Sequence, residues 1–206
     1  MEDILDLYCQ PYNEDYPVVC MDEKPYQLLD EILLPIPMKA GRPQLVDHEY
    51  KRMGTCSIFV FTEPLTGKTV VSARERRTAI DYALEIKELL EVHYPKAKKI
   101  RLVQDNLNTH VPASLYKAFC AKEARELLRR IEFHYTPKHG SWLNIAEISI
   151  SLLASQCINR RIPSISTLNM EIAAWCKDKN SNLVPVNWQF TTEDARIKLK
   201  RLYPII

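Results

Sequence analysis

The sequence predicts one α/β domain in which helices cover a mixed β-sheet. Its 206 residues are enough for a single domain with a sizeable core. Short apolar runs rich in β-branched residues alternate along the chain with longer segments of helical periodicity. One strand, then two or three antiparallel strands, then alternating helices and strands are together typical of a mixed sheet covered by helices.

The first strand is expected in the apolar run 17–22, which ends abruptly in acids and so places Asp22 at its C-terminal end. Pro-Leu-Thr-Gly at 64–67 is typical of a turn between antiparallel strands. A second short apolar run also ends in an acid, Asp105. The later strands are expected at 47–53, 55–63, 68–73, 100–103 and 131–135.

Helices are predicted where caps and periodicity agree. Thr78, with Asp81 three residues later, predicts an N-cap for a helix that runs to about His93 and is stopped by Pro95. Residues 1–16 are interpreted as a lead-in segment with a short helix at 2–8, and the proline-rich stretch 30–46 as an ordered loop. Further helices are expected at 112–119, 122–130, 143–159 and 164–178, and after Thr191 or Thr192.

Composition and charge limit the location of the protein more than its function. A net charge of +2 is too mild to argue for nucleic acid by itself. Six cysteines without a CxxC pair, no signal peptide and no apolar run of ~20 residues predict a cytoplasmic protein with reduced cysteines and no membrane segment. Basic residues gather in clusters at 74–77, 96–101, 129–130, 160–161 and 196–201. These clusters are either solvent-exposed faces of the protein or a surface that binds the phosphates of a nucleic-acid backbone.

Asp22 and Asp105 are the first two candidate functional residues. If their strands are adjacent, both carboxylates lie at the same edge of the sheet. Two anions held close repel each other unless a cation lies between them. Oxygen ligands without a Cys or His cluster favour Mg²⁺ or Mn²⁺ over Zn²⁺.

Glu147 is the third candidate. On a helix beginning at Leu143, the residues Asn144, Glu147, Ser151 and Ser155 would form one polar stripe. A Glu in the first turn of so apolar a helix is either a rim residue or a ligand, and the helix dipole favours it there.

Short polar side chains follow Asp105, in the segment Asn106, Asn108 and His110. Active-site crevices of open α/β sheets usually lie just past strand ends. The alternative is an ordinary polar loop with a surface histidine.

Three carboxylates around two metal ions suit phosphodiester chemistry. A glycosidase also uses paired carboxylates, but it would need a sugar-stacking crevice, for which Trp142 is the only indication. The sequence has no P-loop, GxSxG, HExxH or Rossmann motif.

Three segments resemble the catalytic blocks of DDE-type transposases from bacterial insertion sequences, a group related to the mariner superfamily. They are Val-Val-Cys-Met-Asp22-Glu23, Leu-Val-Gln-Asp105-Asn106 with His110, and Trp142-Leu-Asn144-Ile-Ala-Glu147. The likeness covers roughly residues 17–206 and implies an RNase H-like fold with a five-stranded mixed sheet. It also implies that Asp22, Asp105 and Glu147 bind two Mg²⁺ or Mn²⁺ ions.

The resemblance implies an enzyme that cleaves DNA at element ends and transfers a 3′-hydroxyl into target DNA, as a homodimer on double-stranded DNA at the bacterial nucleoid. Glu23, Asn106, His110 and Asn144 would then position the ligands or the DNA. Family members carry N-terminal helix-turn-helix domains, which are absent before Asp22 here. The alternative is therefore a truncated, non-transposing remnant that keeps the fold and binds DNA or a partner chain.

Overall fold

The computed structural model describes residues 1–138 and 140–203. Their strands form a five-stranded sheet in the order β3-β2-β1-β4-β5. The pairs β1–β2 and β2–β3 are antiparallel, whereas β1–β4 and β4–β5 are parallel, so the predicted mixed sheet is confirmed. The strands are β1 (Val18–Glu31), β2 (Tyr50–Thr62), β3 (Thr69–Arg74), β4 (Ile100–Gln104) and β5 (Ile131–Tyr135).

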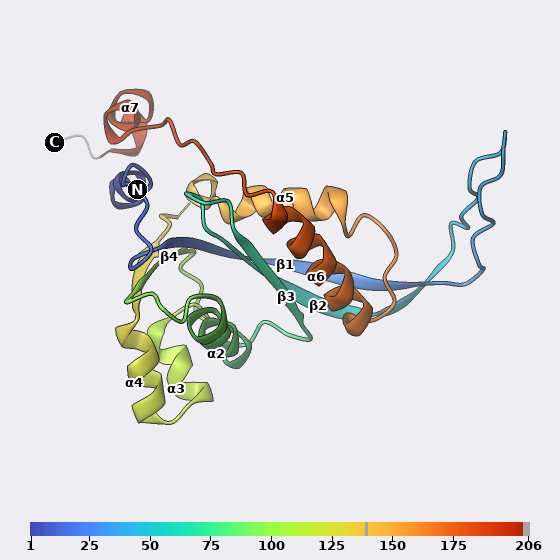
Figure 1. Cartoon of the computed structure of the whole chain (residues 1–206), viewed down its shortest axis with the longest axis horizontal. Helices are drawn as coiled ribbons and strands as arrows, with labels where there is room; N and C mark the ends of the chain where they lie inside the picture. The colour runs from blue at the N-terminus through green and yellow to red at the C-terminus, as the bar shows by residue number, and fades with distance from the viewer. Residues whose placement is uncertain (139, 204–206) are drawn as a thin grey trace.

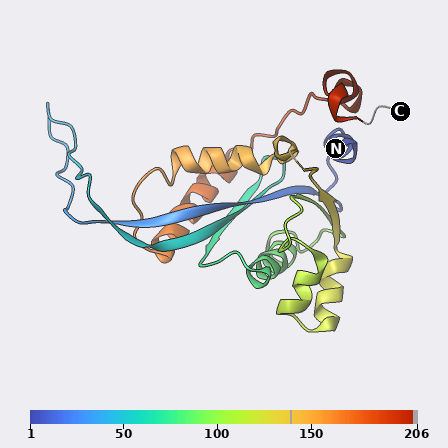
Figure 2. The ribbon, with the colours of Figure 1, turned by 180° about the vertical axis from the view of Figure 1, so that it is seen from behind.

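Helices cover both faces of this sheet (Figures 1 and 2). Because successive side chains of a strand point to opposite faces, Val19 and Met21 of β1 join one core cluster while Val18 and Cys20 join another. One face carries α2 (Ala79–Glu88), α3 (Leu115–Ala118) and α4 (Ala121–Arg129), and the other carries α5 (Ala146–Gln156) and α6 (Ile165–Ser181).

The predicted N-cap of α2 is confirmed, because the Thr78 side chain accepts from the Asp81 amide in a capping box. The helix does reach His93, but its last turn is a π-helix, η1 (Leu89–His93). Thr191 caps the tail helix α7 (Thr192–Lys198) in the same way. Short 3₁₀ turns are η2 (Pro112–Ser114), η3 (Ser141–Leu143) and η4 (Lys200–Leu202).

The prediction that the first strand ends at Asp22 was wrong. β1 continues to Glu31 because its antiparallel pairing with β2 persists as far as Glu31↔Tyr50. Only the parallel pairing with β4 stops near Asp22, at Cys20↔Val103. The segments 47–53 and 55–63, predicted separately, form the single strand β2, with a register irregularity opposite Leu28/Leu29.

The ribbon of β1 and β2 extends away from the helices as an arm (Figure 1). Residues 32–49 at its tip contain no helix, as predicted, and have only isolated bridges such as Ile36↔Leu45. Leu34 is 90% exposed and Met38 75% exposed. The arm is therefore an apolar extension that the domain itself does not cover.

Asparagine side chains of α6 cover the outer edge of β3. Asn180 accepts from the Thr69 amide (2.9 Å) and donates to the Thr69 carbonyl (2.7 Å). Asn169 does the same at Ala73, at 2.8 and 3.1 Å. These contacts satisfy backbone groups that an open edge strand would leave unpaired.

The predicted short helix near the N-terminus is confirmed as α1 (Glu2–Tyr8), and it packs into the domain. Ile4 and Leu5 are fully buried, and they share a core cluster with Ala195 of α7 and Ala146 of α5. The two ends of the chain thus lie side by side against the start of α5 (Figures 1 and 2).

All six cysteines are free thiols. Within residues 1–138 and 140–203, no helix combines the length and the apolar character that crossing a bilayer requires.

Candidate active site

The sheet places Asp22 and Asp105 at the same edge. The last parallel pair of β1 and β4 joins Cys20 to Val103. Asp22 lies two residues after Cys20, and Asp105 lies two residues after Val103, so both follow this pair by the same distance along the sequence. The adjacency on which the sequence argument depended therefore exists. Asp22 is half-buried, and the side chain of Asp105 is 39% exposed.

Glu147 lies in the first turn of α5, as predicted, and is exposed. The helix begins at Ala146 rather than Leu143, so the predicted polar stripe from Asn144 was wrong. Leu143 ends the 3₁₀ turn η3, and Asn144 follows it in an extended conformation (φ −86°, ψ 100°). Asn144 thus precedes the helix.

Asn144 is instead a buried link between the strand of Asp22 and the helix of Glu147. Its Nδ2 donates to the carbonyl of Met21 at 2.8 Å, and its Oδ1 accepts from the Ala146 amide at 3.2 Å. One side chain therefore connects the chain neighbour of Asp22 with the chain neighbour of Glu147.

The electrostatics of Asp22 show that the three acids interact. Burial raises the pKa of Asp22 to about 6; the Glu23 amide, which donates to Asp22 Oδ1 at 2.7 Å, lowers this pKa, and the charges of Asp105 and Glu147 raise it. The carboxylates of Asp105 and Glu147 are thus both within electrostatic range of Asp22.

His110 is buried rather than a surface residue, with a side chain only 1% exposed. Its Nδ1 lies 2.5 Å from Asp105 Oδ1, and its Nε2 lies 2.9 Å from Glu23 Oε1. Burial lowers the pKa of His110, but the hydrogen bonds and charges of Asp105 and Glu23 outweigh it and raise the pKa to about 9. The imidazole is therefore a cation that bridges two carboxylates at neutral pH.

Strand alternation explains why adjacent acids have different partners. Asp22 shares the α5 face of β1 with Cys20, two residues earlier. Glu23 shares the opposite, α2 face with Met21, and His110 lies on that face. The Glu23 side chain is only 4% exposed, and its Oε2 has no hydrogen-bond partner among the described residues.

Two residues that support His110 were missed by sequence reasoning. The Tyr82 ring packs against the imidazole with 4.9 Å between centroids, and its hydroxyl donates to Gln104 Oε1 at 2.8 Å. Gln104 Nε2 donates to the His110 carbonyl at 2.7 Å. The sequence indication was a polar Gln directly before Asp105, at the end of the strand.

Asn106 is a predicted site residue that the structure does not join to this network. It is exposed, and in the described part of the chain no hydrogen bond engages its side chain. Its position directly after Asp105 leaves it free to contact a ligand.

The three carboxylates supply oxygen donors, which suit a hard divalent cation by their chemistry. Burial and the charges of Asp105 and Glu147 raise the pKa of Asp22, and a bound cation would offset both effects. As placed, however, no three His, Cys, Asp or Glu side chains of residues 1–138 and 140–203 converge to hold an ion. The Asp105 carboxylate is directed to His110 through one oxygen.

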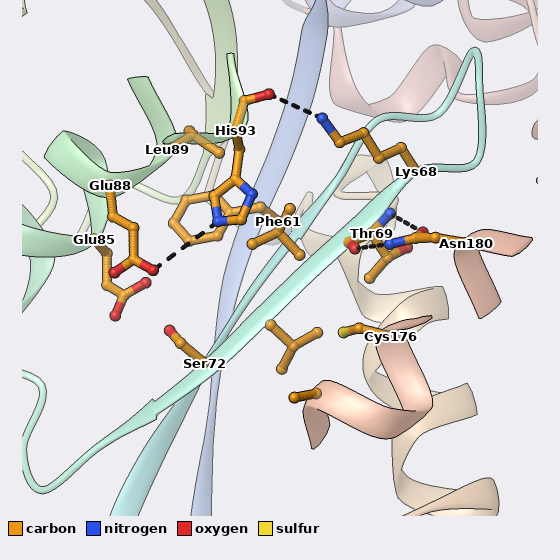
Figure 3. A pocket seen from close by; sticks show the side chains of 13 residues that line it. Phe61, Lys68, Thr69, Ser72, Glu85, Glu88, Leu89, His93, Cys176 and Asn180 are labelled. Carbon is orange, nitrogen blue, oxygen red and sulfur yellow. Dashed lines mark hydrogen bonds and ion pairs between the residues drawn. The ribbon is translucent and has the colours of Figure 1, made fainter. Parts of the chain in front are cut away.

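A cavity of about 300 Å³ lies elsewhere, between β3, η1 and α6 (Figure 3). Glu88 Oε1 and His93 Nε2 face each other there at 4.0 Å, and Lys68 donates to the His93 carbonyl at 2.9 Å. Burial lowers the pKa of His93. None of the three acids lines this cavity, so it is separate from the carboxylate site.

Solved structures of known proteins share the fold of this chain. Two solved structures of Mos1 transposase have a similar fold at 15% identity: a paired-end complex with the left transposon end (TM-score 0.55) and the strand transfer complex (TM-score 0.53). Each match covers 85% of this chain, and 52% and 51% of the respective Mos1 chain, so the chain spans about half the length of these proteins. The fold is therefore RNase H-like, as the resemblance implied.

A search of curated proteins found no match. The family model of the DDE superfamily endonucleases matches residues 17–169, which is more than half of the chain and includes Asp22, Asp105 and Glu147. The chain therefore belongs to the DDE superfamily endonuclease family.

Proposed function

We propose that this chain is a divalent-metal-dependent DNA endonuclease and strand transferase of DNA transposition, with Asp22, Asp105 and Glu147 as its catalytic carboxylates. The observation that carries the proposal is that Asp22 and Asp105 lie at one sheet edge, against which Asn144 holds the start of the helix that carries Glu147. Besides burial, the charges of both Asp105 and Glu147 raise the pKa of Asp22. Family membership supports the same reaction class.

Asp22, Asp105 and Glu147 would hold Mg²⁺ or Mn²⁺, two ions per site. Bound ions of this kind supply an activated hydroxide or 3′-hydroxyl and stabilise the leaving oxygen of an in-line displacement. The carboxylates themselves contribute negative charge that favours cation entry, and burial limits the water that competes for Asp22.

The surrounding residues hold the acids in place. Asn144 fixes the start of α5 against β1 through the Met21 carbonyl. His110 holds one oxygen of Asp105, whose other oxygen has no hydrogen-bond partner among residues 1–138 and 140–203, while Glu23 holds the far nitrogen of the imidazole. Residues behind a ligand restrict its orientation in this way. Asn106, exposed beside Asp105, is placed to contact DNA.

Double-stranded DNA, as element ends and target, is the proposed partner, and the similar Mos1 structures include a complex with a transposon end. In each of the five basic clusters, at least one Lys or Arg side chain is engaged in a contact within the domain. Examples are Lys98, which pairs with Asp15, and Arg196, which pairs with Glu2. Exposed residues such as Arg76 and Arg77 remain for phosphates. The site of action would be the bacterial nucleoid.

A homodimer on DNA is part of the proposal, since two ends must be joined. The apolar arm at 32–49 supports it, because side chains such as Leu34 and Met38 are exposed on one copy and would gain cover from a second. Sedimentation of the protein with and without duplex DNA tests this point, and a monomer under both conditions would contradict it.

Nicking of supercoiled plasmid in Mn²⁺ tests the activity. We expect Asp105→Asn to abolish nicking. Because the Asp105 carboxylate also pairs with the buried imidazole of His110, we expect some loss of melting temperature, so nicking is compared at a temperature at which both proteins are folded. Asp178→Asn, on the exposed side of α6, is the matched control and should nick like wild type. Equal nicking by wild type and Asp105→Asn would refute the proposal.

Calorimetric titration with Mn²⁺ separates catalysis from mere retention of the fold. Binding that is lost in Asp22→Ala supports the metal-dependent enzyme. No binding, or binding unchanged in Asp22→Ala, would identify a chain that keeps the fold and binds DNA or a partner without cleaving.

A further inference from the structure

We propose that Tyr8 of α1 is a positioning residue for the catalytic carboxylates. Its hydroxyl links the strand that carries Asp22 to the segment that carries Glu147. The inference rests on the proposed function and adds to it a residue outside the three family blocks and outside the matched range 17–169.

The Tyr8 hydroxyl contacts both elements of the site. It donates to the Leu143 carbonyl at 2.7 Å, and it lies 3.0 Å from the thiol of Cys20, with both contacts buried. Cys20 precedes Asp22 by two residues on β1, on the same face of the strand. Leu143 ends the turn η3, from which the chain enters α5 and reaches Glu147.

The thiol of Cys20 is buried at the same junction. Cys20 shares a core cluster with Ile145 and Ala146, the two residues that precede Glu147. The contact between Tyr8 and Cys20 is therefore packed against the beginning of α5.

Tyr8 can act as a fixed point because α1 is held from outside by α7. The Tyr8 ring packs on Trp188 with 5.0 Å between centroids. Arg196 of α7 donates twice to Glu2, at 2.7 and 2.9 Å, and the Thr192 hydroxyl donates to Asp6 at 2.5 Å. Figures 1 and 2 show the two helices side by side next to the start of α5.

Tyr8 and Asn144 hold the same junction at two different points. Asn144 joins the Met21 carbonyl to the Ala146 amide, while Tyr8 joins Cys20 to the Leu143 carbonyl. A helix start held at one point can still pivot about it, whereas two points restrict rotation as well as distance. Ligand constellations need placement within ~0.5 Å, so the second point affects how well Glu147 meets Asp22.

Calorimetric Mn²⁺ titration of Tyr8→Phe tests the inference, because this change removes one hydroxyl and keeps the ring. We expect Mn²⁺ affinity to fall on the order of 10-fold, as for other residues that orient metal ligands. Tyr94→Phe is the matched control: it removes a hydroxyl that donates to Glu63 at 2.9 Å, and it should leave Mn²⁺ affinity within about 2-fold of wild type.

A double-mutant cycle distinguishes positioning from general loosening. If Tyr8 acts through Glu147, Tyr8→Phe should have no further effect on Mn²⁺ affinity in the Glu147→Gln background. Fully additive effects, or an equal loss of affinity in Tyr94→Phe, would overturn the inference. If Tyr8→Phe does not fold, Cys20→Ala breaks the same link, with Cys56→Ala as the buried cysteine control on β2.

Amide hydrogen exchange of the metal-free protein keeps this test separate from the proposed function. Tyr8→Phe should accelerate exchange at Ala146 and Glu147 at least 10-fold relative to Tyr94→Phe. Unchanged local exchange would overturn the positioning role even if Asp22→Asn shows that the metal site is real. Conversely, suppose that Tyr8→Phe accelerates local exchange but the wild-type chain binds no Mn²⁺. The structural role of Tyr8 at the start of α5 would then stand, and the proposed metal-dependent activity would be refuted.

Discussion

Nε2 of His110 lies 2.9 Å from Oε1 of Glu23, with the two side chains 1% and 4% exposed. A buried carboxylate without a compensating charge is strongly unfavourable. The imidazolium of His110 supplies that charge, and its other nitrogen reaches Asp105. The orientation of a proposed catalytic carboxylate thus depends on an ion pair behind the sheet edge.

Replacing Glu23 by Gln should lower the pKa of His110 from about 9, because one of the two carboxylates that hold the proton is neutralised. A fall of about one unit or more is expected for an ion pair at this distance. Titration of the His110 ring resonances by NMR measures it. Glu132→Gln is the control, since Glu132 approaches His134 at 3.4 Å, and His110 should titrate as in wild type.

The same imidazole makes stability depend on pH. Its pKa is raised on folding from 6.5 to about 9, so its contribution is complete below pH 6.5 and is lost as the pH rises through 9. The difference in melting temperature between wild type and His110→Gln should therefore be larger at pH 6 than at pH 9.5. A difference that grows towards pH 9.5 would contradict a buried imidazolium.

Asp22 should destabilise the metal-free protein at neutral pH. Its pKa is raised on folding from 3.8 to about 6, so the folded state favours the protonated carboxyl. The contribution of Asp22 to the unfolding free energy is therefore most favourable below pH 3.8, and that advantage is lost as the pH rises through 6. At pH 7 without metal, Asp22→Asn should exceed wild type in unfolding free energy by on the order of 1–2 kcal/mol, after allowance for solvent screening.

Chemical denaturation at pH 4 and pH 7 measures this effect, and the gap between the proteins should be small at pH 4. Saturating Mg²⁺ should stabilise wild type at pH 7 and leave Asp22→Asn much less affected. A variant less stable than wild type at pH 7 without metal would contradict the prediction.

The sequence predicted most of the elements and the placement of Asp22 and Asp105 at one edge of the sheet, but not the contacts between elements. The apolar runs predict β1, β4 and β5 because short buried strands leave a local pattern. Nothing local predicts that β1 continues past Asp22, since that extension depends on pairing with β2. Tyr8 contacts Leu143 across 135 positions, and such a contact leaves no periodicity to detect.

Asn169→Ala and Asn180→Ala should each destabilise the protein by about 1–3 kcal/mol, because each variant leaves an amide and a carbonyl of β3 without their partner. The double variant should also self-associate through the uncovered strand edge. Urea unfolding and light scattering measure the two effects. Asn182→Ala, just past the end of α6, is the control and should match wild type within about 0.5 kcal/mol.

Asn144→Asp removes the amide donor that joins the two halves of the site and adds a carboxylate in its place. The variant keeps the oxygen that accepts from Ala146, but it replaces the donor to the Met21 carbonyl by a second oxygen. Loss of a buried hydrogen bond, with an acceptor left unpaired, should cost about 1–3 kcal/mol of unfolding free energy. Mn²⁺ affinity should fall as well, because the start of α5 is no longer held against β1.

Urea unfolding together with Mn²⁺ titration measures both consequences of Asn144→Asp. Asn108→Asp adds the same charge in the exposed segment after Asp105 and should change the unfolding free energy by less than about 0.5 kcal/mol. If Asn144→Asp were as stable as this control and bound Mn²⁺ as tightly as wild type, the buried amide would have no part in holding Glu147 near Asp22. A loss of stability with unchanged Mn²⁺ affinity would restrict Asn144 to a structural role and leave the placement of Glu147 to other contacts.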